Sequence, residues 1–419
     1  MPQFPLKWLY LDLNSYFASV EQQIEPSYRG KPVAVVPVMS DSTCAIAASY
    51  EAKAFGIKTG TRIWEAKQMC PDLILAPARH DAYVEYHHKI LKEVENHLPI
   101  TVIASIDEVA CKLMDNEAPP EVALKIATKM KKGINDNVGE YLRSSIGIAP
   151  NKYLAKVATE LQKPNGLVIL DADNMQSRLG TLSLRDLPGI GRNMEVRLRM
   201  AGIGSVQDLF KYSPKQMRRI WGSVWGEKMW YMLRGFDIPD LETSRSTVGH
   251  SHVMAPELRD PSKAIHVARR LTVKAAARLR RLGFHARSFS FSARLENGGW
   301  WGMECKCVAA QDNMIFLKML DELWAAMRHE THDARLKKVS VTLHGLVEDS
   351  TVQNGLFDYL NGETKQRSRA LSLSRAMDKL NGKFGRDTVS IGMLPEQGRS
   401  FSGTKIAFTR IPDVQEFVE

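Results

Sequence analysis

The stretch TVIASIDEVACKLMD, residues 101–115, decides the fold. We expect a β-hairpin here, because apolar and β-branched residues run up to Ser105 and their alternation resumes after Asp107 and Glu108 at the turn. Two adjacent carboxylates in an apolar hairpin are costly to bury without a cation. Taken alone, the segment is more simply a solvated acidic turn, so a metal site here needs a further carboxylate from elsewhere.

Asp12 is the candidate for that further carboxylate. It lies near the end of the apolar run WLYLDL, residues 8–13, which predicts a strand, and the segment NSYFASVEQ after it predicts the start of a helix. An Asp at a strand end is most often a turn residue. Together with Asp107 and Glu108, however, it would form a carboxylate site of the kind that binds Mg²⁺ beside phosphate oxygens.

The charge balance points to a polyanionic partner. The chain has 57 Lys and Arg against 47 Asp and Glu, a net charge of +10 and a pI near 9.2. Residues 245–345 contain 17 Lys and Arg against 9 Asp and Glu. One later segment therefore carries most of the positive excess.

Length and cysteine content narrow the class of protein. A chain of 419 residues predicts about three domains. The five cysteines form no CxxC pair, which fits a reducing, cytoplasmic compartment. No run approaches about 18 apolar residues and the first residues contain no apolar signal region, so we expect neither a membrane span nor secretion.

Strands and helices alternate around the acidic hairpin, which is typical of an α/β or α+β core. In the small segment of residues 31–70, Lys53, Lys58 and Arg62 are three closely spaced cations. A solvated helix face is the simplest explanation for them. The other elements expected in this half are strands at residues 32–38, 44–49, 73–76 and 144–149 and helices at residues 81–97, 121–137 and from residue 151.

After residue 170 the character of the chain changes. Residues 184–209 predict a helix, a tight PGIG turn and a second helix, in which Gly189 and Gly191 let the backbone turn sharply and approach a ligand closely. Helix-hairpin-helix units use such exposed N–H groups to hold a DNA phosphate. An ordinary αα-hairpin remains the alternative.

The positively charged segment predicts a compact DNA-binding domain. Residues 236–249 lack apolar periodicity and are expected to be a linker. A long basic helix follows, then strands, a helix around residues 316–328 and a last strand, so two helices on a four-stranded sheet are expected. Such a domain would hold the nucleic acid backbone electrostatically. The expected DNA contacts in its basic helix are Arg278, Arg280 and Arg281.

In combination these motifs resemble the Y-family translesion DNA polymerases, in the bacterial branch of UmuC-type and DinB-type enzymes. The similarity covers nearly the whole chain and rests on five segments in the family's order: YLDLNSYFASVE, SYEAKAFGIKTG, ASIDE, SIGIAPNKYLAKVATELQKPNG and LPGIG. The resemblance implies an α+β multidomain fold, a right-hand polymerase with a ferredoxin-like palm, small fingers, a helical helix-hairpin-helix thumb and an α+β little finger. The implied boundaries are palm 1–20 and 76–175, fingers 21–75, thumb 176–240, linker 241–249, little finger 250–346 and C-terminal tail 347–419.

The resemblance also implies roles for individual residues. Asp12, Asp107 and Glu108 would be the catalytic carboxylates that bind two Mg²⁺ ions together with the Leu13 carbonyl, Asp107 bridging with Asp12 and Glu108 nearer the primer terminus. The implied nucleotide contacts are Phe17, as a steric gate against the sugar, and Tyr50, Lys53 and Lys163 at the triphosphate. Lys53 stands where the family commonly has Arg, and an ammonium cannot form the bidentate contact of a guanidinium. Asn14 replaces a frequent acidic residue.

The implied activity is low-fidelity, template-directed translesion synthesis in an SOS mutagenesis response, by two-metal nucleotidyl transfer from a dNTP to a primer 3′-hydroxyl. The implied partners are primer–template DNA, a sliding clamp bound through Gln353, Leu356 and Phe357, and SOS accessory subunits. The rival is a non-catalytic DNA- and clamp-binding scaffold of a mutagenesis complex, which the intact carboxylates disfavour. A nuclease is disfavoured because no water-activating His is adjacent to these carboxylates in the sequence.

Overall fold

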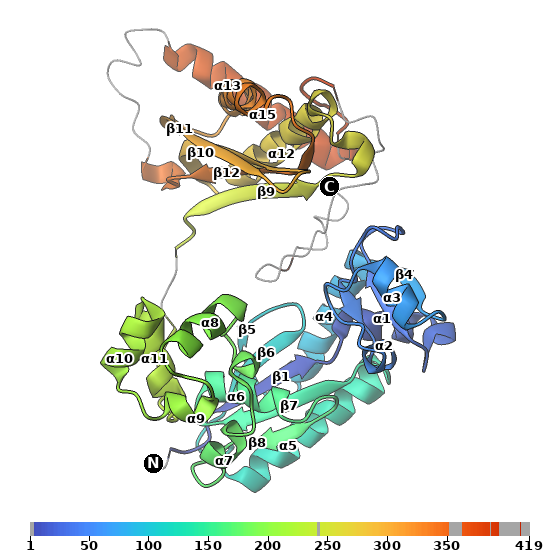
Figure 1. Ribbon diagram of the computed structural model, residues 1–419, viewed down its shortest axis with the longest axis vertical. Helices are drawn as coiled ribbons and strands as arrows, with labels where there is room; N and C mark the ends of the chain where they lie inside the picture. Colours follow the sequence, from blue (N-terminus) through green and yellow to red (C-terminus); the bar gives the residue numbers. More distant parts are fainter. Residues whose placement is uncertain (1–3, 241–243, 352–362, 386, 394–410, 412–419) are drawn as a thin grey trace. The chain divides into compact units, whose positions relative to one another are not determined.

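The computed structural model describes residues 4–240, 244–351, 363–385, 387–393 and 411. The described residues up to Asp240 form one compact unit, and those from residue 244 to residue 393 form a second (Figure 1). Both units combine helices with strands, which confirms the expected α+β class.

The first unit is built around a five-stranded sheet whose strands are β1 Trp8–Leu13, β5 Ile100–Ile103, β6 Glu108–Lys112, β7 Ser144–Ala149 and β8 Leu167–Ile169. Their order is β5-β6-β1-β7-β8, and β1 is antiparallel to both of its neighbours. The hairpin expected at residues 101–115 is β5 and β6, with Asp107 in its turn and Glu108 as the first residue of β6. The predicted central strand and acidic hairpin are thus confirmed as direct neighbours.

Alternate residues of β1 face two separate cores. Leu9 and Leu11 belong to one core, and Tyr10 belongs to the other together with α6 Lys152–Glu160. Because side chains alternate along a strand, Asp12 shares the face of Tyr10. The helices that pack on the face of Leu9 are α1 Tyr16–Ile24, α4 His80–Glu95 and α5 Pro120–Gly133, which continues into a π-helical turn at Ile134–Val138.

Gly147 of β7 allows α6 to lie close to the sheet. A Cβ at this position would lie 2.0 Å from the carbonyl oxygen of Ala155 and 2.6 Å from the Cβ of Ala158. Any larger residue would therefore push α6 outward. This close approach brings the polar face of α6 over Asp12.

A smaller sheet has the strand order β3-β2-β4, with β2 Val33–Val36, β3 Ala47–Ala48 and β4 Ile74–Pro77. Two short helices pack with it, α2 Tyr50–Ala54 and α3 Ile63–Met69. A 3₁₀ turn at Pro26–Tyr28 precedes the first strand of this sheet. The strand expected at residues 44–49 is wrong in its extent. Cys44 instead forms an isolated bridge with Arg62, and the Ala45 N–H donates to the Thr61 carbonyl. This part of the run therefore pairs with the turn before α3, and only two residues pair with β2.

Helices make up the end of the first unit: α7 Met175–Leu179, α8 Arg192–Met200, α9 Val206–Leu209, α10 Pro214–Trp221 and α11 Val224–Met232. The helix expected before the PGIG turn is only a 3₁₀ turn, Leu184–Asp186. Pro188 explains the difference, because a residue before proline avoids the helical region, and Leu187 has φ −80° and ψ 123°.

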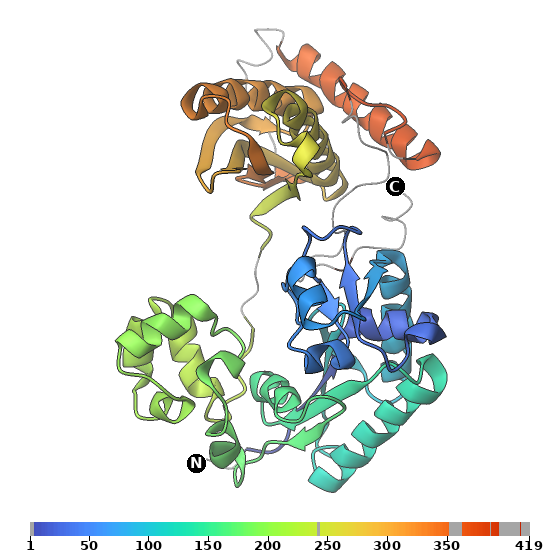
Figure 2. The same ribbon diagram turned by 45° about the vertical axis from the view of Figure 1, so that its right-hand side comes forward.

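The second unit has a four-stranded sheet in the order β11-β10-β12-β9, with strands β9 Thr247–Val253, β10 Phe284–Leu295, β11 Trp300–Ala310 and β12 Leu336–His344. Its helices α12 Pro261–Arg281 and α13 Asn313–Thr331 share the core with one face of this sheet (Figure 2). A short strand β13 Val347–Glu348 pairs with β10, and 3₁₀ turns lie at Pro256–Leu258 and Asp349–Thr351. The expected two helices on four strands are confirmed.

The linker expected at residues 241–249 is too long, because β9 already begins at Thr247. The strand was missed because Val248 is the only one of its residues that is buried, so it shows no apolar alternation. The tail also contains a helix that the sequence did not predict, α15 Glu363–Phe384, which packs against α12 and α13. Gln353, Leu356 and Phe357 lie outside the described residues.

The helices among the described residues were examined for length and apolar character, and none of them could span a membrane.

Candidate active site

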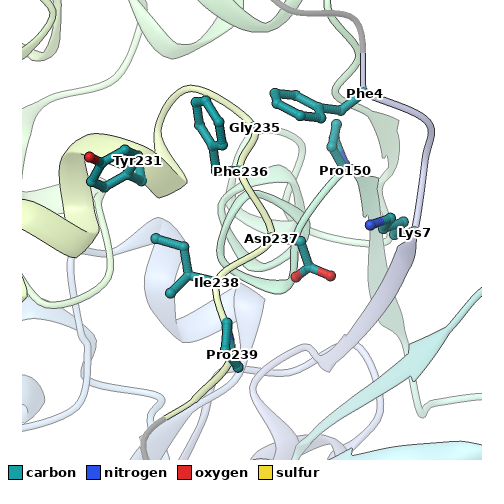
Figure 3. A pocket seen from close by; sticks show the side chains of 9 residues that line it. All are labelled: Phe4, Lys7, Pro150, Tyr231, Gly235, Phe236, Asp237, Ile238 and Pro239. Atoms are coloured by element: carbon teal, nitrogen blue, oxygen red, sulfur yellow. The ribbon is translucent and has the colours of Figure 1, made fainter.

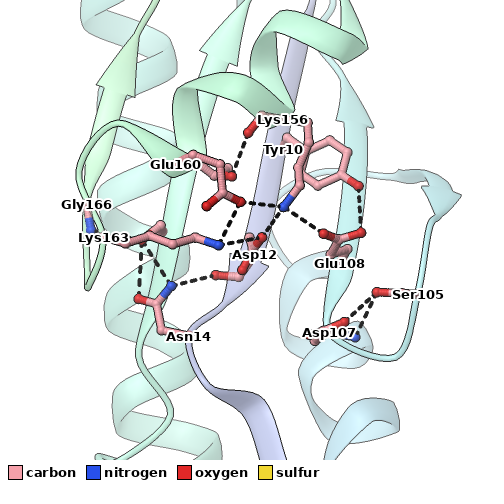
Figure 4. Close-up of polar contacts among 12 residues, drawn as sticks. Tyr10, Asp12, Asn14, Ser105, Asp107, Glu108, Lys156, Glu160, Lys163 and Gly166 are labelled. Atoms are coloured by element: carbon pink, nitrogen blue, oxygen red, sulfur yellow. Dashed lines mark hydrogen bonds and ion pairs between the residues drawn. The ribbon is translucent and has the colours of Figure 1, made fainter. Parts of the chain in front are cut away.

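The register of β1 and β6 places two of the predicted carboxylates side by side. Asp12 is paired with Glu108 across the ladder, and paired residues project from the same face of a sheet. Asp107 lies in the turn immediately before, where its carbonyl accepts the Leu13 N–H at 2.9 Å. Figure 4 shows Asp12 and Glu108 beside Lys156 of α6, with Asp107 lying apart from them next to Ser105.

A lysine that the sequence analysis missed lies between two of these carboxylates. The Lys156 ammonium forms an ion pair with Asp12 and lies 2.7 Å from Glu108 Oε1 and 2.9 Å from Glu160 Oε1. Lys163 lies 3.0 Å from Asp12 Oδ2 and 2.8 Å from Glu160 Oε1. Lys156 and Glu160 are four residues apart on α6, and this spacing is a signal that could have pointed to an ion pair on one face of the helix.

The electrostatics of this cluster follow from burial and charge. Burial alone would lower the pKa of Lys156, but the charges of Asp12, Glu108 and Glu160 outweigh it and raise that pKa above its ordinary value. The Tyr10 hydroxyl also donates to Glu108 Oε2 at 3.1 Å. Lys156 therefore stays charged and holds the carboxylates together.

Asp107 has a separate environment in this structure. The Ser105 hydroxyl donates to its Oδ1 at 2.5 Å, so the carboxylate faces the turn (Figure 4). Burial, reinforced by the charges of Asp12 and Glu108, raises the pKa of Asp107 to about 6. A nearby cation would oppose both effects and favour the ionised form.

The donor set fits a divalent cation. Within the described ranges, no three His, Cys, Asp or Glu side chains already converge as a metal group. Carboxylates and a backbone carbonyl are nevertheless the oxygen ligands that hard divalent ions prefer, and the Lys156 ammonium shows that Asp12 and Glu108 already share one cation. A metal could bind once Lys156 moves aside and Asp107 turns away from Ser105.

Phe17 has a stacked partner that fixes its ring. It lies 4.4 Å from the Tyr83 ring with an interplanar angle of 14°. The Tyr83 hydroxyl donates to Glu21 Oε1 at 2.6 Å, and Arg79 Nε donates to Glu21 Oε2 at 3.0 Å. Tyr16 is buried and its hydroxyl donates to the Tyr83 carbonyl, so it belongs to the core.

Tyr50, Lys53 and Lys163 surround the same carboxylates. Lys53 Nζ lies 4.3 Å from the centroid of the Tyr50 ring. Burial, followed by the Lys163 charge, lowers the pKa of Lys53. Burial, followed by the charges of Asp12 and Glu160, raises the pKa of Tyr50 to about 12. Two distant segments, α2 and the loop after α6, thus contribute one side of the site, with a lysine from each.

A cavity of about 730 Å³ connects this site with the PGIG turn. It is lined by Lys156 and Glu160 on one side and by residues 187–191 on the other. Gly189 has φ +91°, which a side chain would strain, and an added Cβ would lie 3.1 Å from Trp225 Nε1. A Cβ at Gly191 would meet no atom within 4 Å, so this glycine leaves open space for a close ligand.

A second cavity, of about 440 Å³, is lined by Phe4, Lys7, Pro150 and residues between 231 and 239, and does not include Asp12, Asp107 or Glu108 (Figure 3). The Phe4 and Phe236 rings lie 4.9 Å apart, and the Trp8 indole donates to Asp237 Oδ1 at 3.0 Å. Asn151 Nδ2 donates to the carbonyls of Met232 and Phe236. These contacts join the last helix to the sheet, which is a structural role.

One face of the second unit's sheet carries small hydroxylated residues. Along β10, Phe289 and Phe291 enter the core, so the residues between them face the other way. The pairing partners across β12 and β9 are also small, except for Lys338 and Val253. The residues in register on this face are Ser290, Ser292 and Arg294 of β10, Ser340, Thr342 and Lys338 of β12, Gly249, Ser251 and Val253 of β9, and Gly302, Glu304 and Trp300 of β11.

Arg280 forms structural contacts within the second unit. Its guanidinium donates to both carboxylate oxygens of Asp378 on α15, at 2.6 and 2.8 Å, and to the Gln311 carbonyl at 2.5 Å. Only 5% of its side chain is exposed. These partners compete with a phosphate, in contrast to the surface position expected for it. Arg278 and Arg281 lie in the same last turn of α12.

Comparisons with known proteins show what this chain is similar to. The chain matches the impB/mucB/samB family over residues 11–160, the DNA polymerase-iota thumb domain over 185–237 and the impB/mucB/samB C-terminal domain over 245–356. It is 31% identical to DNA polymerase IV of Moorella thermoacetica (91% of this chain, 94% of the relative) and 30% identical to that of Pelotomaculum thermopropionicum (93% and 97%). A solved Y-family DNA polymerase chimera of Dbh and Dpo4 matches with a TM-score of 0.69 at 24% identity, over 82% of this chain and 99% of that chain.

Proposed function

Because the chain belongs to the impB/mucB/samB family of Y-family DNA polymerases, we propose that the carboxylates around Asp12 perform its DNA synthesis. It is a DNA-directed DNA polymerase, so its substrates are primer–template DNA and deoxynucleoside triphosphates. The pairing of Asp12 with Glu108 around the Lys156 ammonium carries the assignment. The intact acidic set disfavours the non-catalytic scaffold.

Each residue of the site has a proposed task in nucleotidyl transfer. Asp12, Asp107 and the Leu13 carbonyl would hold a divalent ion at the triphosphate, and Glu108 would hold one at the primer terminus. Y-family polymerases depend on divalent metal; bound Mg²⁺ would lower the pKa of the attacking 3′-hydroxyl and neutralise charge on the leaving pyrophosphate. Tyr50, Lys53 and Lys163 would orient the triphosphate, and Phe17 would exclude a 2′-hydroxyl.

Primer extension with point variants tests the carboxylate assignment. We expect Glu108→Gln and Asp107→Ala to lower kcat by about 10³-fold, since several kcal/mol of transition-state stabilisation would be lost. For Glu108→Gln the KM for dNTP should change little. Primer–template affinity, measured by fluorescence anisotropy, should stay unchanged in both variants. Full extension by Asp107→Ala with normal DNA binding would show the assignment to be wrong.

DNA would be held at two places. In the first unit, the cavity between Glu160 and Gly189 would take the primer strand, with the N–H groups of the PGIG turn at a phosphate. In the second unit, the hydroxylated sheet face would accept the DNA backbone, because small side chains let phosphates approach and Arg294 and Lys338 supply charge. Arg278 and Arg281 remain proposed contacts at the end of α12.

Low fidelity and lesion tolerance are proposed from the size of the segment that would close over the nascent base pair. It has three short strands and helices of 5 and 7 residues. Such a small body offers little geometric checking of a base pair. The rate of incorrect against correct incorporation, measured opposite undamaged and damaged templates, tests this; a high selectivity on undamaged DNA would contradict it.

We also propose a sliding clamp, and SOS accessory subunits, as partners, and cytoplasmic mutagenesis during the DNA-damage response as the setting. Support for the clamp is the sequence QNGLF at residues 353–357. Support for the cytoplasm is that all five cysteines are free thiols. Deleting residues 353–357 should abolish clamp-stimulated synthesis and leave basal extension unchanged. Equal loss of both activities would contradict a simple tether.

A further inference from the structure

Lys131, at the end of α5, is bound by three backbone carbonyls. Its Nζ donates to the carbonyl oxygens of Ser144 at 2.6 Å, Asn165 at 2.8 Å and Gly166 at 3.0 Å. An ammonium has three donors and no acceptor, so these carbonyls satisfy it completely. Ser144 begins β7, whereas Asn165 and Gly166 belong to the loop between α6 and β8.

This loop, residues 161–166, contains Lys163, which contacts Asp12 and Glu160. Asn165 has φ +60°, a left-handed conformation that asparagine tolerates better than most residues but that contacts with neighbouring groups still help to hold. The loop's geometry therefore depends on contacts made from outside it.

Two sets of contacts hold the loop from opposite sides. The buried Asn14 and Ser145 accept its N–H groups: Asn165 N–H donates to Asn14 Oδ1 at 2.7 Å and Gly166 N–H donates to Ser145 Oγ at 3.2 Å. Lys131 donates to its carbonyls. The first set lies beside the carboxylates, but Lys131 comes from a helix on the other face of the sheet.

Burial lowers the pKa of Lys131 to about 8, so the ammonium has given up much of its hydration. A hydrocarbon side chain at this position would remove the ammonium from three carbonyl oxygens, of which that of Gly166 would keep the Ile146 N–H as a donor at 3.0 Å. Unsatisfied backbone carbonyls favour a rearranged loop, because they regain partners by turning towards water. The lost hydrogen bonds would be those of Asn165 and Gly166, whose backbone lies close to Lys163 in the loop.

We propose that Lys131 is a positioning residue that fixes the 161–166 loop so that Lys163 can reach the triphosphate of the incoming nucleotide. This inference rests on the function proposed above for the carboxylate site. Asn14 takes part in the same device: its amide oxygen accepts the Asn165 N–H while its amide nitrogen donates to Ser145 Oγ at 3.1 Å. A carboxylate at position 14 could accept the first bond but could not donate the second.

The test compares Lys131→Met with Lys132→Met, which removes the same charge from the next, exposed residue of α5. We expect Lys131→Met to raise the KM for dNTP about tenfold with less than a twofold change in kcat. Lys131→Gln keeps a polar donor, so its KM for dNTP should lie between those of Lys131→Met and the wild type. If Lys131→Met does not fold, Lys131→Gln replaces it in the comparison. Lys132→Met should match the wild type.

Two further measurements separate positioning from a general loss of structure. Hydrogen exchange of the peptide covering residues 161–167 should rise at least tenfold in Lys131→Met, while peptides of α6 and β1 keep their protection. In a Lys163→Met background, Lys131→Met should add no further rise in KM, since it acts through Lys163.

Unchanged exchange and unchanged KM in both Lys131 variants, with a wild type that extends primers normally, would overturn the inference and leave the polymerase assignment intact. An additive rise in KM in the Lys163→Met background would overturn it as well. The exchange measurement needs no substrate, so it tests the positioning role by itself. A wild type that fails to extend primers would contradict the proposed function and not the exchange result.

Discussion

Lys156 holds together the carboxylates that are proposed to bind metal. Its side chain is only 17% exposed and its ammonium lies among Asp12, Glu108 and Glu160, where it balances charges that would otherwise repel one another. The carboxylates were predictable from the sequence, since acidic residues in apolar strands are conspicuous. The lysine was not, because a lysine on an amphipathic helix is usually a solvated residue.

Replacing Lys156 by Met should therefore change how the protein responds to metal. Removing one partner of a buried ion cluster costs on the order of 3–5 kcal/mol, so the metal-free variant should unfold at a lower temperature. Mg²⁺ or Mn²⁺ should then raise the Tm of Lys156→Met more than that of the wild type, because the ion no longer competes with the ammonium. Thermal unfolding with and without EDTA measures this. Lys152→Met, on the same helix but paired with Asp240, is the control, and equal metal-induced shifts in all three proteins would contradict the prediction.

Tyr83 should control how well Phe17 rejects ribonucleotides. The stacked ring holds Phe17 upright, so Tyr83→Ala should reduce discrimination between dNTP and rNTP about tenfold, and Phe17→Ala should reduce it more. Tyr83→Phe keeps the stack and loses only the hydrogen bond to Glu21. Its discrimination should stay within about threefold of wild type. The ratio of kcat/KM for the two nucleotides is the measurement, and a Tyr83→Phe variant as permissive as Tyr83→Ala would contradict the stacking argument.

At the scale of elements, predictions succeeded where one face of an element is strongly apolar and failed where it is not. β1 and β7 are buried along nearly their whole length, and α12 has a clear apolar stripe. β9 buries only Val248, and α15 is polar enough that its apolar contacts do not stand out in the sequence. The prediction of a helix before Pro188 was wrong for a local reason, because proline keeps the residue before it out of the helical conformation.

α4 supports the acidic hairpin of β5 and β6 through a buried histidine, which gives a pH dependence. His87 Nδ1 lies 2.7 Å from the Ile106 carbonyl, next to Asp107, and burial lowers the pKa of His87 to about 4. In the unfolded chain the His87 imidazole has its ordinary pKa near 6.5 and is protonated below that pH. Between about pH 6.5 and 4 the unfolded state therefore binds more protons than the folded state. The free energy of unfolding should fall as the pH falls through this window, by up to roughly 3 kcal/mol.

Urea unfolding between pH 7.5 and 4.5 measures this effect. His87→Gln keeps a donor for the Ile106 carbonyl but does not titrate, so it should lose less stability on acidification than the wild type. His88→Gln, at the adjacent position, should follow the wild type. Parallel curves for wild type and His87→Gln would show that His87 does not carry the effect.

At the scale of the whole molecule, the positive charge predicted from composition resides in the second unit, but its use depends on the fold. Of the three arginines expected to contact DNA, Arg280 is instead paired with Asp378. The open sheet face offers Arg294 and Lys338, which are opposite each other in the ladder. Charge counting located the domain, while the fold decided which cations face outward.

The salt dependence of DNA binding should report these two residues. Each phosphate contact contributes about 0.9 to the slope of log K against log salt, so Arg294→Ala and Lys338→Ala should each reduce the slope by about 1. Lys318→Ala, on the exposed side of α13, should leave it unchanged. Fluorescence anisotropy at several salt concentrations measures the slopes. If Lys318→Ala lowers the slope as much as the other two, the sheet face has no special role.

The sequence by itself determined the order of the motifs, the strand that ends near Asp12, the acidic hairpin and the basic second half, because these follow from local patterns of residues. Only the tertiary structure decided that Lys156 lies between Asp12 and Glu108, that Arg280 is enclosed by α15 and that Lys131 holds the loop of Lys163. These contacts join residues far apart in the chain. They depend on strand register, on which face of a helix packs and on the close approach that Gly147 permits, and none of these is written in the spacing of residues along the sequence.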